Sequence, residues 1–240
     1  MLRVALLLAV LLGLAGQAHA GPPDPLADPR LASVQAALRA VLDDAERQGL
    51  PGDLLQGKIR EGLAKGVPPA RILAVVQAMR EDLGQQRSRV RARLGWRAPS
   101  HNLLRALCEA KRADVSAAAT DALLDGLGRR GPQGHPALAR AIEVLTDLKL
   151  AGYPVDRALR VVRLVAAREP GALGRVGAAI ERLRRSEGLT AAEAIETVTR
   201  HLERGDGLDR ALRGAQVDQS HGQKTEHGRA TAPGAGKKPR

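Results

Sequence analysis

Residues 126–131 read Gly-Leu-Gly-Arg-Arg-Gly and match, letter for letter, the G-x-G-x-x-G pattern with which dinucleotide sites hold a pyrophosphate. That chemistry needs a strand before the glycines and a helix that begins within them. Here the Ala- and Leu-rich segment from Val115 to Leu124 is predicted to be a helix that runs into the glycines, and Pro132 follows them. We therefore interpret residues 126–131 as a loop that ends a helix, and we predict no nucleotide cofactor.

Histidine could serve as a metal ligand or a general base, but the six histidines of the chain are scattered. His101, His135 and His201 lie in the body of the chain without a cysteine or a second histidine at metal-ligand spacing. The patterns of serine hydrolases, zinc proteases and P-loop proteins do not occur in the sequence either. The sequence therefore predicts no catalytic residue, no metal site and no cofactor, and indicates a protein that is not an enzyme.

The single cysteine, Cys108, has no partner for an intramolecular disulfide, so stability must come from packing alone. With Leu104 and Leu107 it falls on one apolar face of a predicted helix. We interpret Cys108 as a small buried apolar residue rather than a reactive thiol, because no exposed, electropositive setting surrounds it.

One basic segment has a composition that could bind anions. From Leu83 to Cys108 the chain has six arginines, no acidic residue and the only tryptophan. Arginines four residues apart on a helix repel each other by about 0.3 kcal/mol a pair, and nearby negative charge would offset this repulsion. Either acids outside the segment neutralise it in the fold, or it binds an anionic surface. The residues of this candidate site are Arg87, Arg89, Arg91, Arg93, Trp96 and Arg97.

The elements that would position these residues are predicted to be helices. The chain has no Phe, one Trp and one Tyr, so its core must consist of Leu, Val, Ile and Ala. Such small side chains favour closely packed helices over a sheet, and no alternating strand pattern occurs. The sequence therefore predicts an all-α fold.

Glycine corners divide the predicted helices. A glycine can close one helix in the left-handed conformation, the apolar residue after it folds back, and Pro or Thr opens the next helix. At the last clear corner, Thr190 and Glu193 predict a capping box. Gly205-Asp206 repeats this pattern loosely. Four corners follow it closely: Gly49-Leu50-Pro51, Gly66-Val67-Pro68, Gly152-Tyr153-Pro154 and Gly188-Leu189-Thr190.

The spacing of the corners predicts an array of short antiparallel helical hairpins, which is a degenerate α-solenoid or an irregular bundle. Gly49 to Gly66 and Gly188 to Gly205 are each 17 residues apart, about the length of one helix and its turn. Two such units would give a period of about 34 residues, which tetratricopeptide repeats also have. The aromatic signature of those repeats is missing, so we assign no named family.

Apolar residues recur with helical period between the corners. The first helix is predicted to begin at the N-cap Asp28 and Pro29. The stripes are Leu31, Val34, Leu38, Val41/Leu42 and Ala45; Ile72, Val75/Val76, Met79 and Leu83; Leu138, Ala141/Ile142, Leu145 and Leu148; Val155, Leu159, Val162 and Val165; and Leu173, Val176, Ile180 and Leu183.

The two ends of the chain differ from its helical body. Residues 1–20 predict a secretory signal peptide, because Arg3 precedes an apolar run and Ala18-His19-Ala20 is a cleavage pattern. Residues 21–28 form a Pro-rich lead, and residues 29–213 are the predicted helical body, with a candidate sub-boundary near 95–101. Residues 214–240 are predicted to be a disordered basic tail, because they are too polar to bury a core.

These features predict an exported, non-enzymatic helical binding or scaffolding module of the cell envelope, periplasmic or extracellular after cleavage following Ala20, with an unidentified protein or peptide partner. The alternative, suggested by a net charge of +12, is an electrostatic binder of anionic surfaces through Arg87–Arg97 and the tail. Lipid, envelope polymer and nucleic acid all fit that alternative, and no specific nucleic acid is predicted. A continuous apolar groove would favour the binding or scaffolding module. An unpaired arginine face would favour the electrostatic binder. A pocket that brings a histidine and a carboxylate together would indicate an enzyme.

Overall fold

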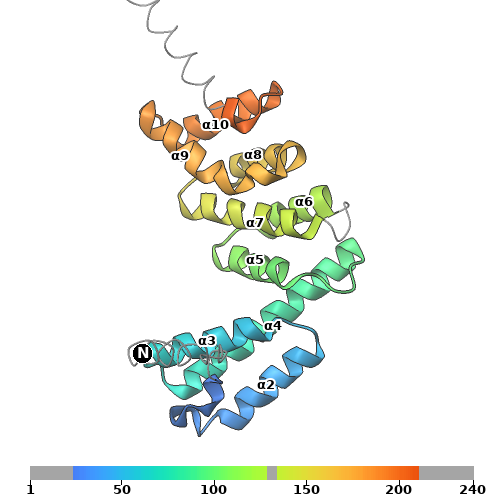
Figure 1. Ribbon diagram of the computed structural model, residues 1–240, viewed down its shortest axis with the longest axis vertical. Helices are drawn as coiled ribbons and strands as arrows, with labels where there is room; N and C mark the ends of the chain where they lie inside the picture. The colour runs from blue at the N-terminus through green and yellow to red at the C-terminus, as the bar shows by residue number, and fades with distance from the viewer. Residues whose placement is uncertain (1–23, 129–133, 211–240) are drawn as a thin grey trace, which may run out of the picture. The chain divides into compact units, whose positions relative to one another are not determined.

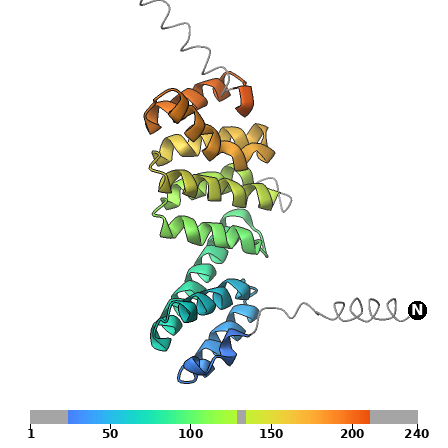
Figure 2. The same ribbon diagram turned by 60° about the vertical axis from the view of Figure 1, so that its left-hand side comes forward.

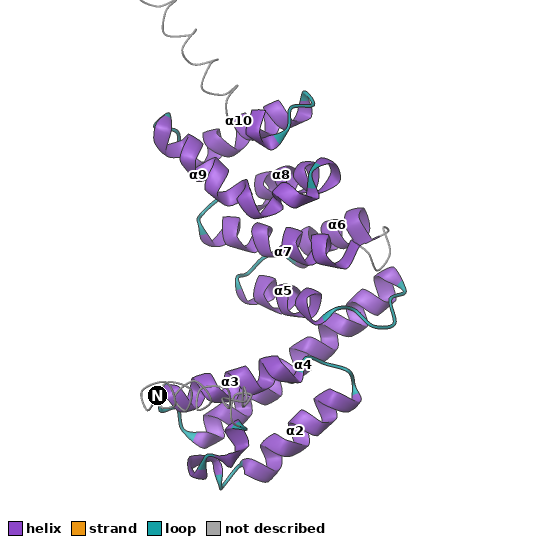
Figure 3. Ribbon diagram, viewed as in Figure 1, coloured by secondary structure: helices purple, strands orange, loops and turns teal. Residues whose placement is uncertain are grey.

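The computed structural model describes residues 24–128 and 134–210, and within these ranges all regular structure is helical, as Figures 1 and 3 show. The prediction of an all-α fold is confirmed. The helices, with η marking 3-10 helices, are η1 (Pro25–Ala27), η2 (Pro29–Leu31), α2 (Gln35–Arg47), α3 (Gly52–Ala64), α4 (Pro69–Leu94), α5 (His101–Arg112), α6 (Ala117–Leu127), α7 (His135–Leu150), α8 (Val155–Arg168), η5 (Pro170–Arg175), α9 (Val176–Ser186) and α10 (Ala191–Glu203).

Some predictions fall outside the described residues. The signal peptide (1–20), the first three residues of the Pro-rich lead (21–23) and the basic tail (214–240) lie there, and so do residues 129–133 of the glycine-rich loop. Over the part of the chain that is described, no helix has both the length and the apolar content needed to cross a bilayer.

The predicted glycine corners are confirmed by the backbone. All five glycines have positive φ angles, which is the left-handed conformation that ends a helix. After α2, the N–H of Leu50 donates to the carbonyl of Ala45 at 2.8 Å, so the apolar residue folds back as expected. The φ angles are 60° at Gly49, 66° at Gly66, 85° at Gly152, 64° at Gly188 and 97° at Gly205.

A further corner was missed because its residue is not glycine. Asp114 follows α5 with a φ of 57°. The N–H of Val115 donates to the carbonyl of Ala110 at 2.9 Å, which is the same closure as after α2. Aspartate tolerates the left-handed region better than most residues, so the middle of the chain uses the same corner with a different residue.

Side-chain caps begin several of the helices. The hydroxyl of Ser100 accepts from the N–H of Leu103, and that of Ser116 accepts from the N–H of Ala119. The capping box predicted at the start of α10 is confirmed, because the side chains of Thr190 and Glu193 each accept from the other residue's backbone N–H.

The predicted start of the first helix is wrong. Asp28 does act as a cap, but its carboxylate accepts from the N–H of Arg30 and also pairs with that guanidinium at 2.8 Å. These local bonds close the short 3-10 turn η2, and the α-helix begins later, at Gln35.

The chain divides into two compact units, Met1–Glu81 (unit 1) and Asp82–Arg240 (unit 2), and the boundary falls within α4. The sub-boundary near residues 95–101 stays a prediction. In unit 1, α2 packs against α3, and η1 contacts both helices. Its fully buried side chains include Leu31, Leu38, Leu55 and Ile59.

The helices of unit 2 pack in succession. Helices α5, α7 and α9 contact one another in turn, as do α6, α8 and α10, and Figures 1 and 2 show the six lying over one another along the unit. The stripe predicted in α7 is confirmed, because Leu138, Ile142, Leu145 and Leu148 are all buried. The core of this unit is aliphatic and alanine-rich, as the composition predicts.

Candidate functional site

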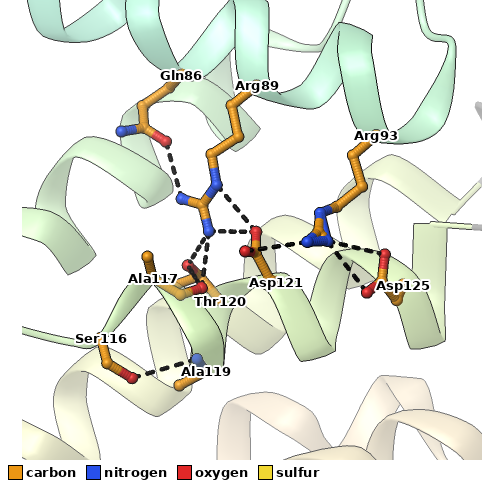
Figure 4. Close-up of polar contacts among 9 residues, drawn as sticks. All are labelled: Gln86, Arg89, Arg93, Ser116, Ala117, Ala119, Thr120, Asp121 and Asp125. Atoms are coloured by element: carbon orange, nitrogen blue, oxygen red, sulfur yellow. Dashed lines mark hydrogen bonds and ion pairs between the residues drawn. The ribbon is translucent and has the colours of Figure 1, made fainter.

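Arg89, at the centre of the predicted basic segment, projects from α4 onto the first turns of α6 (Figure 4). Its Nε donates to Asp121 Oδ1 at 2.9 Å, and its Nη2 pairs with the same carboxylate. Nη2 also donates to Thr120 Oγ1 at 2.7 Å and to the carbonyl of Ala117 at 2.8 Å, and Nη1 to Gln86 Oε1 at 3.2 Å. The guanidinium is thus held in place, and its side chain is only 26% exposed.

Arg93, one turn further along α4, continues this arrangement. Its guanidinium lies 3.1 Å from Asp121 Oδ2 and 3.2 Å from Asp125 Oδ2 (Figure 4). Two arginines four residues apart on α4 therefore face two aspartates four residues apart on α6. We call these four residues, Arg89, Arg93, Asp121 and Asp125, the charge ladder. Acids from another helix therefore offset the repulsion between the two arginines, in agreement with the interpretation that acids outside the segment neutralise it in the fold.

The other basic residues of the segment are placed differently. Arg87 is half-buried, whereas Arg91 and Arg97 are exposed and form no ion pair among the described residues. The nearby acid Asp82 pairs with Lys111 of α5. Binding of an anionic surface by Arg87–Arg97 stays a prediction, and among the arginines outside the charge ladder Arg91 and Arg97 are the exposed ones.

Trp96 is half-buried and packs against the core of unit 2. Its ring stacks on His135 with the ring centroids 3.7 Å apart and the planes tilted by 31°. Burial lowers the pKa of His135 below its ordinary value. Trp96, one of the residues of the candidate anion site, thus has a protein partner in His135.

The remaining candidate groups for chemistry have structural surroundings. His201 is buried at the end of α10 with its Nδ1 3.1 Å from Asp206 Oδ2, and the N–H of Asp206 donates to the carbonyl of His201 at 3.1 Å. This pair stabilises the corner after α10. Cys108 is 2% exposed, and burial raises the pKa of its thiol to about 11, so it is the buried apolar residue that was predicted. Within the described ranges, no group of three or more side chains is arranged to hold a metal ion.

A cleft of unit 2 lies beside α8 and has a volume of about 560 Å³. Its apolar floor comes from α6 and α8, and its charged rim from α8 and α10. We call it the α8 groove. It is lined by Gly126, Leu127, Asp156, Leu159, Arg160, Arg163, Leu164, Ala167 and Glu203.

The charges of the α8 groove are partly satisfied. Arg160 forms an ion pair with Glu203 across the groove, from α8 to α10. Asp156 and Arg163 are exposed and form no ion pair among the described residues. They lie seven residues apart on α8, which is roughly 10 Å along a helix. The groove thus has an apolar floor with a negative and a positive group about two turns apart.

Comparisons of this chain with protein-family models, with curated proteins and with solved structures find no match.

Sequence reasoning did not find the α8 groove, although α8 contains a signal for it. Of the stripe predicted in α8, Val162 and Val165 are buried, whereas Val155 and Leu159 are half-buried and Leu159 lines the groove. Leu164 and Ala167 lie three residues apart outside that stripe and line the groove. A second apolar strip on an amphipathic helix indicates a surface that contacts something other than the core.

Proposed function

We propose that this chain is a non-catalytic binding module and that the α8 groove holds a segment of a partner polypeptide. The observation that carries the proposal is the apolar floor of the groove. The groove has a volume of about 560 Å³, which is typical of ligand sites. Among the described residues, the lining of the groove holds no histidine, cysteine or hydroxyl group.

We further propose that the helices form an array of antiparallel hairpins. The succession of contacts along unit 2 supports it, and so does a recurring arginine contact about one hairpin further along the chain. The separations are 38 residues for Arg105 to Glu143, 35 for Arg157 to the carbonyl of Ala192, 34 for Arg168 to the carbonyl of Leu202 and 34 for Arg175 to Asp209.

The partner segment that fits the groove best is an amphipathic helix. An apolar stripe on such a helix would cover Leu159 and Leu164, in the manner of helix-in-groove recognition. An acid on that helix would face Arg163, and a base two turns away would face Asp156. Arg160 and Glu203 already satisfy each other, so we expect them to contribute little.

Capture from envelope extracts with three forms of the chain tests this function. The wild-type chain should capture the partner. Leu164→Asp places a charge in the floor of the groove, so this variant should fail to capture it. Leu150→Asp is the control, because Leu150 is 70% exposed and lies outside the groove. Binding should persist at high salt, since apolar contact is not screened. Equal capture by all three forms, or elution of the partner by salt alone, would contradict the proposal.

We also propose export, on the pattern of residues 1–20, with the module acting in the cell envelope. Sequencing of the N-terminus of protein recovered from cells tests this, and it should read Gly-Pro-Pro-Asp.

The electrostatic binder is the second candidate, because Arg91 and Arg97 are exposed without an ion pair in the described part of the chain. Replacing both by Gln should weaken binding to acidic lipid vesicles at low salt without disturbing the charge ladder. Unchanged binding would remove the segment from consideration.

A further inference from the structure

Unit 1 has a separate pocket at the corner between α3 and α4, about 310 Å³ in volume. None of its lining residues belongs to the α8 groove or to the basic segment. We call it the corner pocket. It is lined by Lys58, Glu61, Gly62, Lys65, Val67, Arg71, Ile72 and Val75.

The floor of the corner pocket is aliphatic and open. A Cβ atom on Gly62 would lie 2.8 Å from Ile72 Cγ1, so the backbone of α3 is in close contact with that side chain. Val67 folds back over the end of α3, where its N–H donates to the carbonyl of Gly62 at 2.9 Å. Val75 belongs to a stripe predicted to be core, yet it is 39% exposed at this pocket. The pocket therefore leaves apolar surface in contact with water.

The rim of the corner pocket is mostly cationic. Lys58 and Lys65 each place Nζ 2.6 Å from an oxygen of Glu61, and these two bonds hold the pKa of Glu61 at about 2. Glu61 is therefore ionised at neutral pH and already has two partners. Arg71 is exposed and forms no ion pair among the described residues. The rim thus has three cations against one carboxylate, and its unsatisfied group is a guanidinium.

We propose that the corner pocket binds an aliphatic carboxylate, with its alkyl chain on the valine and isoleucine floor and its carboxylate at Arg71. The planar fork of a guanidinium donates to both oxygens of a carboxylate, which makes it a better binding group for a carboxylate than a lone ammonium. The excess of positive charge disfavours a cationic amphiphile of the same length. This site is independent of the proposed α8 groove, and neither requires the other.

Titration calorimetry of the full chain with a series of carboxylates tests the proposal. Acetate should not bind measurably, and affinity should rise from hexanoate to octanoate to decanoate. Each methylene that becomes buried is worth about a fourfold gain, and the gain should stop once the pocket is filled. Decyltrimethylammonium, which has the same chain length as decanoate but a positive head, should not bind.

Two pairs of variants locate the site. Arg71→Gln should lower decanoate affinity severalfold or more, whereas Arg39→Gln, an exposed arginine of α2 outside the pocket, should not. Val75→Asp should abolish binding, whereas Leu150→Asp should leave it intact. Val75 is 39% exposed and Leu150 70% exposed, so neither change places a fully buried charge in the core. Equal binding of acetate and decanoate, or decanoate binding that survives both Arg71→Gln and Val75→Asp, would overturn the proposal.

Discussion

At the scale of single residues, the charge ladder changes how the basic segment is interpreted. Local sequence shows arginines four residues apart with no acid between them. The acids that face them are Asp121 and Asp125, which lie about 30 residues later and are brought close by the packing of α6 on α4. Reversing Arg89 and Arg93 would therefore disturb the fold as well as any anion site. Arg91 and Arg97 are the better positions to test binding.

The stack of Trp96 on His135 predicts a dependence of stability on pH. Burial lowers the pKa of His135 in the folded chain, so the unfolded chain binds a proton more readily. Stability from this group is fully present above the ordinary histidine pKa, about 6.5, and is lost as the pH falls toward the lowered value. Urea unfolding at pH 8 and pH 5 should show a larger loss for wild type than for His135→Gln.

The matched control is His101→Gln, because His101 is exposed at the start of α5. That variant should lose as much stability on acidification as wild type. Emission of Trp96, the only tryptophan, should follow the titration of His135 and lose that dependence in His135→Gln. Equal pH dependence in all three proteins would contradict the assignment.

At the scale of the helices, the corner at Asp114 is a site where a substitution should stabilise the fold. An L-residue other than glycine is disfavoured in the left-handed region, although aspartate tolerates it. Asp114→Gly should therefore raise the free energy of unfolding by about 0.5 kcal/mol. Gly152→Ala, at a corner with a φ of 85°, should lower it by about 1 kcal/mol. Urea unfolding of both variants measures the difference, and a destabilised Asp114→Gly would show that the aspartate has another role.

The helix corners and core stripes could be predicted because their causes are local. Glycine conformation, the Thr190–Glu193 cap and the stripe of α7 each depend on residues within a few turns. The start of α2 was misplaced because Asp28 caps the short 3-10 turn η2, where its carboxylate binds both the N–H and the guanidinium of Arg30. The charge ladder joins residues about 30 positions apart, so no local pattern contains it. The α8 groove also joins distant residues, from α6, α8 and α10, and only its apolar strip on α8 is local.

At the scale of the whole molecule, basic charge is unevenly distributed. Residues 24–81 contain equal numbers of acidic and basic side chains, whereas residues 82–210 have an excess of arginine. Most of the remaining net charge belongs to residues 211–240. Electrostatic attraction to a polyanion should therefore depend little on unit 1.

The core of unit 2 predicts a sharp contrast between two apolar positions of α7. Ile142 is fully buried and Leu150 is 70% exposed. Ile142→Asp buries an unpaired carboxylate and should lower the free energy of unfolding by at least about 3 kcal/mol. Leu150→Asp should change it by no more than about 0.5 kcal/mol. Thermal unfolding followed by circular dichroism compares them, and similar melting of both variants would show that the stripe of α7 is not core.

The burial of Cys108 has a kinetic consequence. A thiol reagent attacks the thiolate, and with a pKa of about 11 and 2% exposure this group is almost unreactive while α5 stays packed. Modification must therefore await an opening that exposes α5, and its rate at low reagent concentration is proportional to the population of that open form. Because the chain has no other cysteine, the unmodified protein contains its own reporter of how often this part of the core opens.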